Sequence, residues 1–140
     1  MVDPNAFPAE IISVIAAGFL VLASVLAQHV SNVARRGPGY AMSDRSTPPE
    51  MTGFYGRATR TLANNVESAL MYAPPTLIAI ILGKAGALSH SAAVVYIAAR
   101  TIFTLCYWLK ISAIRSLAWL AGMLSIAAMY YVAVEAAMGK

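Results

Sequence analysis

Four apolar segments, each long enough to cross a membrane, leave this 140-residue chain few folds to adopt. The hydrocarbon core of a bilayer is about 30 Å thick, and about 20 helical residues span it. The segments cover residues 10–33, 53–82, 89–111 and 114–137. They lack the alternation of apolar and polar residues that membrane-barrel strands show, which excludes a closed barrel. The sequence therefore predicts a single all-α domain over residues 1–140, an integral membrane four-helix bundle.

The composition supports this class of protein. Hydrophobic residues make up 59% of the chain and charged residues 11%, whereas soluble domains carry about 25% charged residues. A soluble domain of this size could not bury so much apolar surface. The single cysteine, Cys106, excludes an intrachain disulfide. We expect no metal, because no cluster of His, Cys and carboxylates has ligand spacing. We also expect no nucleic acid, because no basic run is interleaved with aromatic residues.

The cations indicate how the chain is oriented. The loop of residues 37–51 is rich in Pro and Gly and is predicted to be non-helical. The cations on its side of the membrane are Arg35, Arg36, Arg45, Arg57, Arg60, Lys110 and Arg115. The other side has Lys84 and Lys140. Because cytoplasmic segments carry the excess of Lys and Arg, we expect loop 37–51 to be cytoplasmic and both termini outside. The compact chain suggests a bacterial inner membrane.

A polar stripe enters the second segment from the cytoplasmic side. It consists of Arg57, Arg60, Asn64 and Glu67, spaced three, four and three residues apart. At about 100° per residue, these side chains fall within about 80° of one another on a helix. Lipid offers no partner to two cations, an amide and a carboxylate. The stripe must therefore face protein, water or a ligand.

The third segment carries a second stripe, Tyr96, Arg100, Tyr107 and Lys110, with Phe103 between its members. Arg100 is predicted near the middle of the bilayer, at a depth comparable to that of Glu67. One interpretation is a buried ion pair between Arg100 and Glu67 that joins the second and third segments. Such a pair would not exclude a ligand site nearby.

The remaining cations allow two interpretations. Basic residues beside a membrane commonly contact anionic lipid headgroups, which suits Arg35, Arg36 and Lys110. Arg60 and Arg115 instead lie on helix faces that carry other polar groups. A cationic cleft between helices would bind a small polyanionic ligand.

Several motifs together resemble a known family. The run Pro48-Pro49-Glu50 is followed by Arg57-x-x-Arg60-x-x-x-Asn64-x-x-Glu67 and later by Tyr96-x-x-x-Arg100, Tyr107 and Ile114-Arg115-Ser116. This pattern resembles the MAPEG family, the membrane-associated proteins in eicosanoid and glutathione metabolism, which includes microsomal glutathione transferases. The resemblance covers nearly the whole chain. It implies a homotrimer of four-helix bundles that binds glutathione between neighbouring subunits at the cytoplasmic side.

The resemblance also assigns roles to residues. It implies that Arg115 stabilises the glutathione thiolate, which would attack a lipophilic electrophile or reduce a lipid peroxide. The implied contacts to glutathione are made by Arg35, Arg36, Arg60, Asn64, Glu67, Arg100 and Tyr107. Phe103 and Ser68 depart from the family pattern, since well-known members carry a tyrosine near the first position and an aromatic residue at the second.

These departures leave other hypotheses open. One is a non-catalytic trimer of the same fold that binds membrane lipids or serves as an accessory subunit to a membrane-protein partner. Phe103 would then mark a decayed active site. Another is a component of a carrier or channel, which would require polar residues through all four segments. The outer half of this chain has few.

Overall fold

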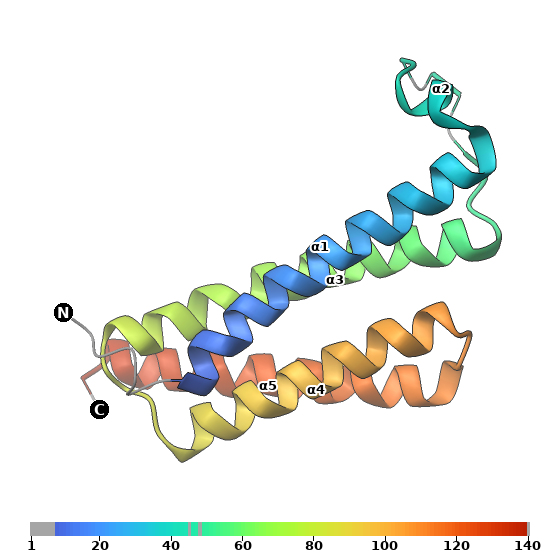
Figure 1. Cartoon of the computed structure of the whole chain (residues 1–140). Helices are drawn as coiled ribbons and strands as arrows, with labels where there is room; N and C mark the ends of the chain where they lie inside the picture. Colours follow the sequence, from blue (N-terminus) through green and yellow to red (C-terminus); the bar gives the residue numbers. More distant parts are fainter. Residues whose placement is uncertain (1–7, 45, 48, 140) are drawn as a thin grey trace.

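The structure is a computed structural model that describes residues 8–44, 46–47 and 49–139. Of the residues used above, Arg45, Pro48 and Lys140 lie outside the described ones. Five α-helices follow one another along the described chain (Figure 1). They are α1 (Pro8–Arg36), α2 (Pro38–Ala41), α3 (Gly53–Ile81), α4 (Ala87–Trp108) and α5 (Ser112–Ala137). The fold is all-α, as predicted.

The four long helices coincide with the four predicted segments to within a few residues. Two expectations need correction: that all four segments are apolar enough to cross a membrane, and that the loop of residues 37–51 is non-helical. Three helices, α1 from Ala9, α4 and α5, are long and apolar enough to cross a membrane. Helix α3 has 29 residues, which is also long enough, but its charged stripe makes it more polar. The loop of residues 37–51 was predicted to be non-helical, whereas Pro38–Ala41 forms the single turn of α2. Proline favours this place because its missing N–H is not needed in the first helical turn.

The long helices run side by side (Figure 1). Helix α1 packs against α3, and α4 packs against α5, while α1 and α3 also contact this second pair. The beginning of α1 and the end of α5 lie at one end of the molecule, and α2 lies at the other (Figure 1). We call the end that carries α2 the loop end. It is the end predicted to be cytoplasmic.

The apolar core lies in the half of the molecule away from the loop end. The rings of Tyr72 and Tyr96 stack there with centroids 3.6 Å apart. The residues that build this cluster are Ala17, Tyr72, Ala92, Ala93, Tyr96, Ile126 and Met129. Each phenol has a hydrogen-bond partner, Ser13 Oγ at 2.7 Å from Tyr72 and Ser68 Oγ at 3.1 Å from Tyr96. These hydroxyl pairs satisfy polar groups that lipid could not.

The loop between α1 and α3 is tied to both helices. Gly56 lies so close to the loop that a Cβ atom there would be 2.3 Å from the Met51 carbonyl oxygen. In the loop itself, the Ser46 N–H donates to the Asp44 carboxylate over 3.1 Å. This backbone hydrogen bond lowers the pKa of Asp44. The loop is thus held by local hydrogen bonds and by close approach to the first turn of α3.

The turn between α4 and α5 is very short and has one unusual residue. Lys110 has a φ of 64° and lies directly after the C-cap residue Leu109. A left-handed residue here ends a helix sharply, and glycine usually occupies the position. From α3, the Arg57 Nε donates to the Trp108 carbonyl oxygen over 3.1 Å. The turn brings the first residues of α5 back beside the last residues of α4.

Candidate functional site

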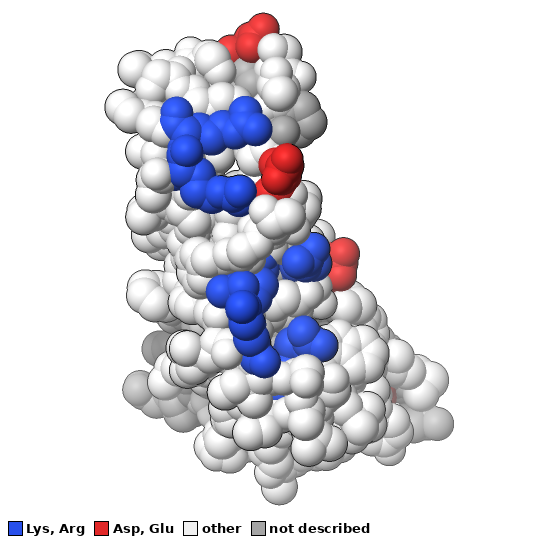
Figure 2. Space-filling model, turned by 90° about the vertical axis from the view of Figure 1, so that its right-hand side faces the viewer, with Lys and Arg blue, Asp and Glu red and all other residues white. Residues whose placement is uncertain are grey.

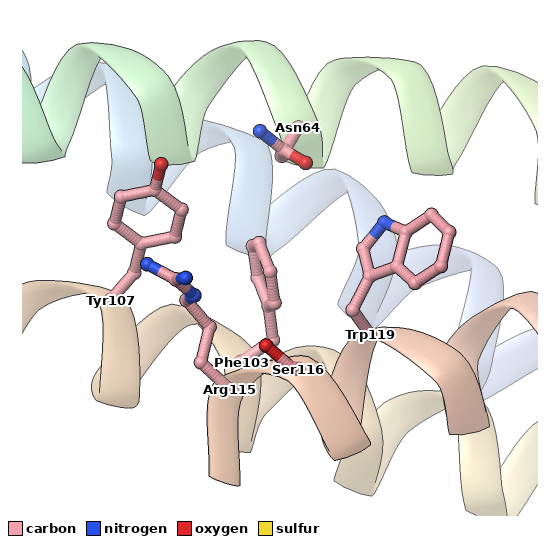
Figure 3. A pocket seen from close by; sticks show the side chains of 6 residues that line it. All are labelled: Asn64, Phe103, Tyr107, Arg115, Ser116 and Trp119. Atoms are coloured by element: carbon pink, nitrogen blue, oxygen red, sulfur yellow. The ribbon is translucent and has the colours of Figure 1, made fainter. Parts of the chain in front are cut away.

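A pocket of about 250 Å³ lies where α3, α4 and α5 meet near the loop end. Its lining residues are Asn64 from α3, Phe103 and Tyr107 from α4, and Arg115, Ser116 and Trp119 from α5 (Figure 3). Three predicted site residues, Asn64, Tyr107 and Arg115, are therefore brought together. Helical spacing and the short α4–α5 turn explain why residues so distant in sequence converge here.

The rings and the guanidinium of the pocket contact one another directly. Phe103 and Tyr107 are one turn apart on α4, and their rings meet edge to face with centroids 5.5 Å apart. The Arg115 guanidinium carbon lies 4.8 Å from the centroid of the Tyr107 ring. Figure 3 shows the Arg115 side chain rising from α5 alongside this ring. A cation over an aromatic face is attracted by the electrons of the ring, so Tyr107 fixes where the positive charge lies.

Arg100 is buried beside this pocket, with 1% of its surface exposed. Its Nη2 donates to Asn65 Oδ1 over 2.5 Å and to the Asn64 carbonyl oxygen over 3.1 Å. The predicted ion pair with Glu67 is wrong: Glu67 is exposed, and no salt bridge joins the two among the described residues. Glu67 follows Asn65 by two residues, about 200° around the helix. The face of α3 that meets Arg100 therefore carries Asn65.

Asn65 was not singled out from the sequence, yet it links three helices. Its Nδ2 donates to Ser24 Oγ on α1 over 2.8 Å and to Thr104 Oγ1 on α4 over 3.0 Å. It belongs to a buried polar stripe on α3 made of Thr61, Asn65, Ser68 and Tyr72. Its spacings of four, three and four residues indicate one helix face as clearly as those of the stripe Arg57, Arg60, Asn64 and Glu67, so the sequence could have predicted it.

Arg35 and Arg36 are not part of the pocket. Arg35 Nη1 donates to the carbonyl oxygens of Glu50 and Thr52, each over 3.3 Å. Arg36 Nη1 donates to the Thr47 carbonyl oxygen over 3.3 Å, and its guanidinium lies 4.8 Å from the centroid of the Tyr40 ring. Within one chain, both arginines therefore hold the loop to the end of α1.

Arg60 and Glu67 lie on the outside of α3. Both side chains are exposed, and Asn64 Nδ2 donates to the Arg60 carbonyl oxygen over 2.9 Å. Figure 2 looks onto the loop end and shows Lys and Arg gathered there, with few acidic residues among them. The charged end of the molecule is thus strongly positive.

Three lining residues, Phe103, Ser116 and Trp119, lay outside the predicted site. Phe103 was noted as a departure from the family pattern, Ser116 only as part of the motif with Arg115, and Trp119 was not predicted as a site residue. Trp119 is 45% exposed, so one side of its indole faces away from the protein. Trp119 lies one turn after Arg115 and Ser116 on α5. This spacing places it on the same helix face as Arg115, and it could have predicted Trp119 as a lining residue.

The lining combines two chemical halves. One guanidinium, one phenol, one hydroxyl and one amide form the polar half, and the rings of Phe103 and Trp119 form the apolar half. Such a lining can bind an anionic group beside an apolar molecule.

Comparisons with known proteins agree with the architecture. The model of the MAPEG family matches residues 11–134. No curated protein and no solved structure matches the chain. The match extends from the first turn of α1 to the last turns of α5 and includes every residue that lines the pocket. The chain therefore belongs to the MAPEG family.

Proposed function

We propose that this protein is a glutathione-dependent membrane transferase or peroxidase that acts on a lipophilic electrophile. The observation that carries the proposal is the Arg115 guanidinium held against Tyr107 inside a pocket with an apolar wall. A neighbouring guanidinium lowers the pKa of a thiol, and the thiolate is the reactive nucleophile. Arg115 is the residue that stabilises the thiolate in this proposal.

The other lining residues receive supporting roles. Asn64 and the Tyr107 hydroxyl are placed to hydrogen-bond the amides of the tripeptide. Phe103 and Trp119 form the wall against which the electrophile packs, and the exposed side of Trp119 leaves access from lipid. In transfer, the thiol first releases its proton to water and the sulfur then forms a bond to the electrophilic carbon. The electron pair goes to the leaving group, or to the oxygen of a conjugated carbonyl, which takes a proton from water. In peroxide reduction, two thiols become a disulfide while the hydroperoxide becomes an alcohol and water.

We further propose that the site is completed in a homotrimer of four-helix bundles. Glutathione has two carboxylates, and Arg115 is the one cation that lines the pocket within the described chain. Arg60 and the pair Arg35 and Arg36 are the candidates for binding the carboxylates, from a neighbouring copy. Glu67 supports this arrangement, because an exposed carboxylate on a membrane-length helix requires a partner. In this proposal Glu67 binds the glutathione ammonium.

Glutathione titration of the detergent-purified protein tests the proposal. The wild type should show the ultraviolet absorbance of a thiolate near neutral pH, and Arg115→Ala should lose it. Lys110→Ala is the matched control, because Lys110 is a nearby cation that does not line the pocket. Absence of both a thiolate signal and glutathione binding in the wild type would overturn the proposed function.

The charge of the loop end favours a second candidate, a non-catalytic trimer that binds anionic lipids as an accessory subunit. Its support is the gathering of Lys and Arg seen in Figure 2. Headgroup contacts of this kind depend on ionic strength. Native mass spectrometry that retains anionic lipid, with no glutathione binding in any lipid mixture, would favour this candidate over the enzyme.

A further inference from the structure

Four side chains form a continuous line of contacts that ends at the thiolate-binding arginine. Arg100, Phe103 and Tyr107 lie on one face of α4, spaced three and four residues apart. The Arg100 guanidinium carbon is 4.3 Å from the centroid of the Phe103 ring. Phe103 then meets Tyr107 edge to face, and Tyr107 carries Arg115 on its ring. From the buried interior to the pocket, the order is a cation, two rings and a second cation.

The inner end of this line is fixed. Arg100 is 1% exposed, and Asn65 Oδ1 and the Asn64 carbonyl oxygen accept its Nη2 hydrogens. Its Nε and Nη1 have no hydrogen-bond partner among the described residues. The face of the Phe103 ring is therefore the contact that offsets the loss of hydration at this part of the guanidinium. A desolvated cation gains more from an aromatic face than an exposed one does, so an aromatic ring at residue 103 has a physical purpose.

The outer end of the line has little else to hold it. The Arg115 guanidinium makes no hydrogen bond within the described part of the chain, and the side chain is half-buried. Its place is set by the Tyr107 ring. That ring is in turn supported at its edge by Phe103, which is 3% exposed.

We propose that Arg100 and Phe103 are positioning residues that hold Tyr107, and through it the Arg115 guanidinium, in the place where the glutathione thiolate binds. This inference rests on the proposed function. It gives Phe103 a role that needs the ring and not a hydroxyl group. A phenylalanine at this position then preserves the site instead of marking its decay.

A matched pair of variants tests the inference. Phe103→Tyr keeps the aromatic face, whereas Phe103→Leu keeps an apolar side chain and removes the ring. The first readout needs no glutathione: the rate at which phenylglyoxal modifies Arg115, measured by mass spectrometry of the peptide that contains it. We expect Phe103→Leu to raise this rate about fivefold and Phe103→Tyr to stay within about twofold of the wild type.

The second readout is the thiolate absorbance at saturating glutathione as a function of pH. Phe103→Leu should give about fivefold less thiolate near neutral pH with a smaller change in glutathione affinity. Phe103→Tyr should follow the wild-type profile. A thermal melt of each variant verifies folding, and Phe103→Met replaces Phe103→Leu if the latter does not fold.

Each outcome decides one question. Equal modification rates in the wild type, Phe103→Leu and Phe103→Tyr would overturn the positioning role. If the rates differ as expected while the wild type shows neither a thiolate signal nor glutathione binding, the contact line stands and the proposed enzyme function fails. A faster Arg115 modification in Phe103→Tyr than in Phe103→Leu would also contradict the inference, because the ring would then not be the supporting group.

Discussion

The Arg115 guanidinium lies over the ring of Tyr107, with 4.8 Å between the guanidinium carbon and the ring centroid. The contact joins the first turn of α5 to the end of α4 across a turn of three residues, 109–111. Because the two helices are adjacent in sequence, this contact forms without the rest of the molecule having to close a long loop. The positive charge of the pocket is therefore tied to the most local piece of tertiary structure in the chain.

Two substitutions of Tyr107 should distinguish the contribution of its ring from that of its hydroxyl group. Tyr107→Phe keeps the contact with Arg115, whereas Tyr107→Leu removes it. We expect Tyr107→Leu to shift the rise of the glutathione thiolate signal to higher pH and to reduce the thiolate at neutral pH about fivefold to tenfold. Tyr107→Phe should keep the pH profile and weaken glutathione binding only modestly, through one lost hydrogen bond. Identical pH profiles for the two variants would show that the ring does not hold Arg115.

Asn65 and Asn64 provide a neighbouring pair for a stability measurement. Asn65 bonds to Ser24, Thr104 and Arg100, whereas the Asn64 side chain bonds to a carbonyl oxygen of its own helix. Asn65→Ala should lower the free energy of unfolding in detergent by about 2 kcal/mol, because it leaves a buried guanidinium hydrogen without its side-chain acceptor. Asn64→Ala should change it by less than about 0.5 kcal/mol. A similar loss in both variants would contradict the role of Asn65.

Sequence patterns predicted the helices well because apolar membrane-length segments have few alternatives. Asn64, Tyr107 and Arg115 stand out because polar residues are rare in such segments, and the resemblance to the MAPEG family then assigned them to a ligand site. The partner of Arg100 was missed because its choice depends on the rotation of α3 against α4. Glu67 and Asn65 are both candidates by depth, and only packing decides between faces about 200° apart.

The loop contacts could not be predicted for a different reason. Arg35 and Arg36 look available for a ligand in the sequence, but their partners are the carbonyl oxygens of Glu50, Thr52 and Thr47. Every residue carries a backbone carbonyl, so a sequence does not reveal which ones a chain reversal will present to an arginine.

The left-handed residue between α4 and α5 predicts a stabilising substitution. Lys110 has a φ of 64°, and this conformation costs a residue with a Cβ about 1 kcal/mol relative to glycine. Lys110→Gly should therefore raise the free energy of unfolding by about 1 kcal/mol. Lys110→Ala is the control, since it removes the ammonium but keeps the Cβ and should give no gain. A denaturant titration in detergent that ranks alanine above glycine would refute this expectation.

Association of subunits should depend on Glu67. The carboxylate is exposed on α3, and in the proposed trimer its partner is the ammonium of glutathione bound between two copies, so association in the presence of glutathione should depend on it. Glu67→Ala should weaken association by about 2 kcal/mol or more, visible as dissociation on dilution in native mass spectrometry. Leu70→Ala, on the same helix and 69% exposed, should have a smaller effect. A wild-type protein that remains monomeric at every concentration would exclude the trimer.

Gly122 on α5 faces the buried arginine of α4 so closely that a Cβ there would lie 3.3 Å from Arg100 Cδ. A methyl group would force a small shift of the guanidinium stem, and a larger side chain would compete for the space that the stem fills. The two positions therefore cannot drift independently. Among homologues, a bulky residue at the position of Gly122 should occur together with a smaller residue at the position of Arg100, and sequences that combine bulk with arginine should be depleted. This interior contact thus constrains the order in which substitutions can occur during evolution. Arg100 has to be replaced by a smaller residue before Gly122 can be replaced by a large one.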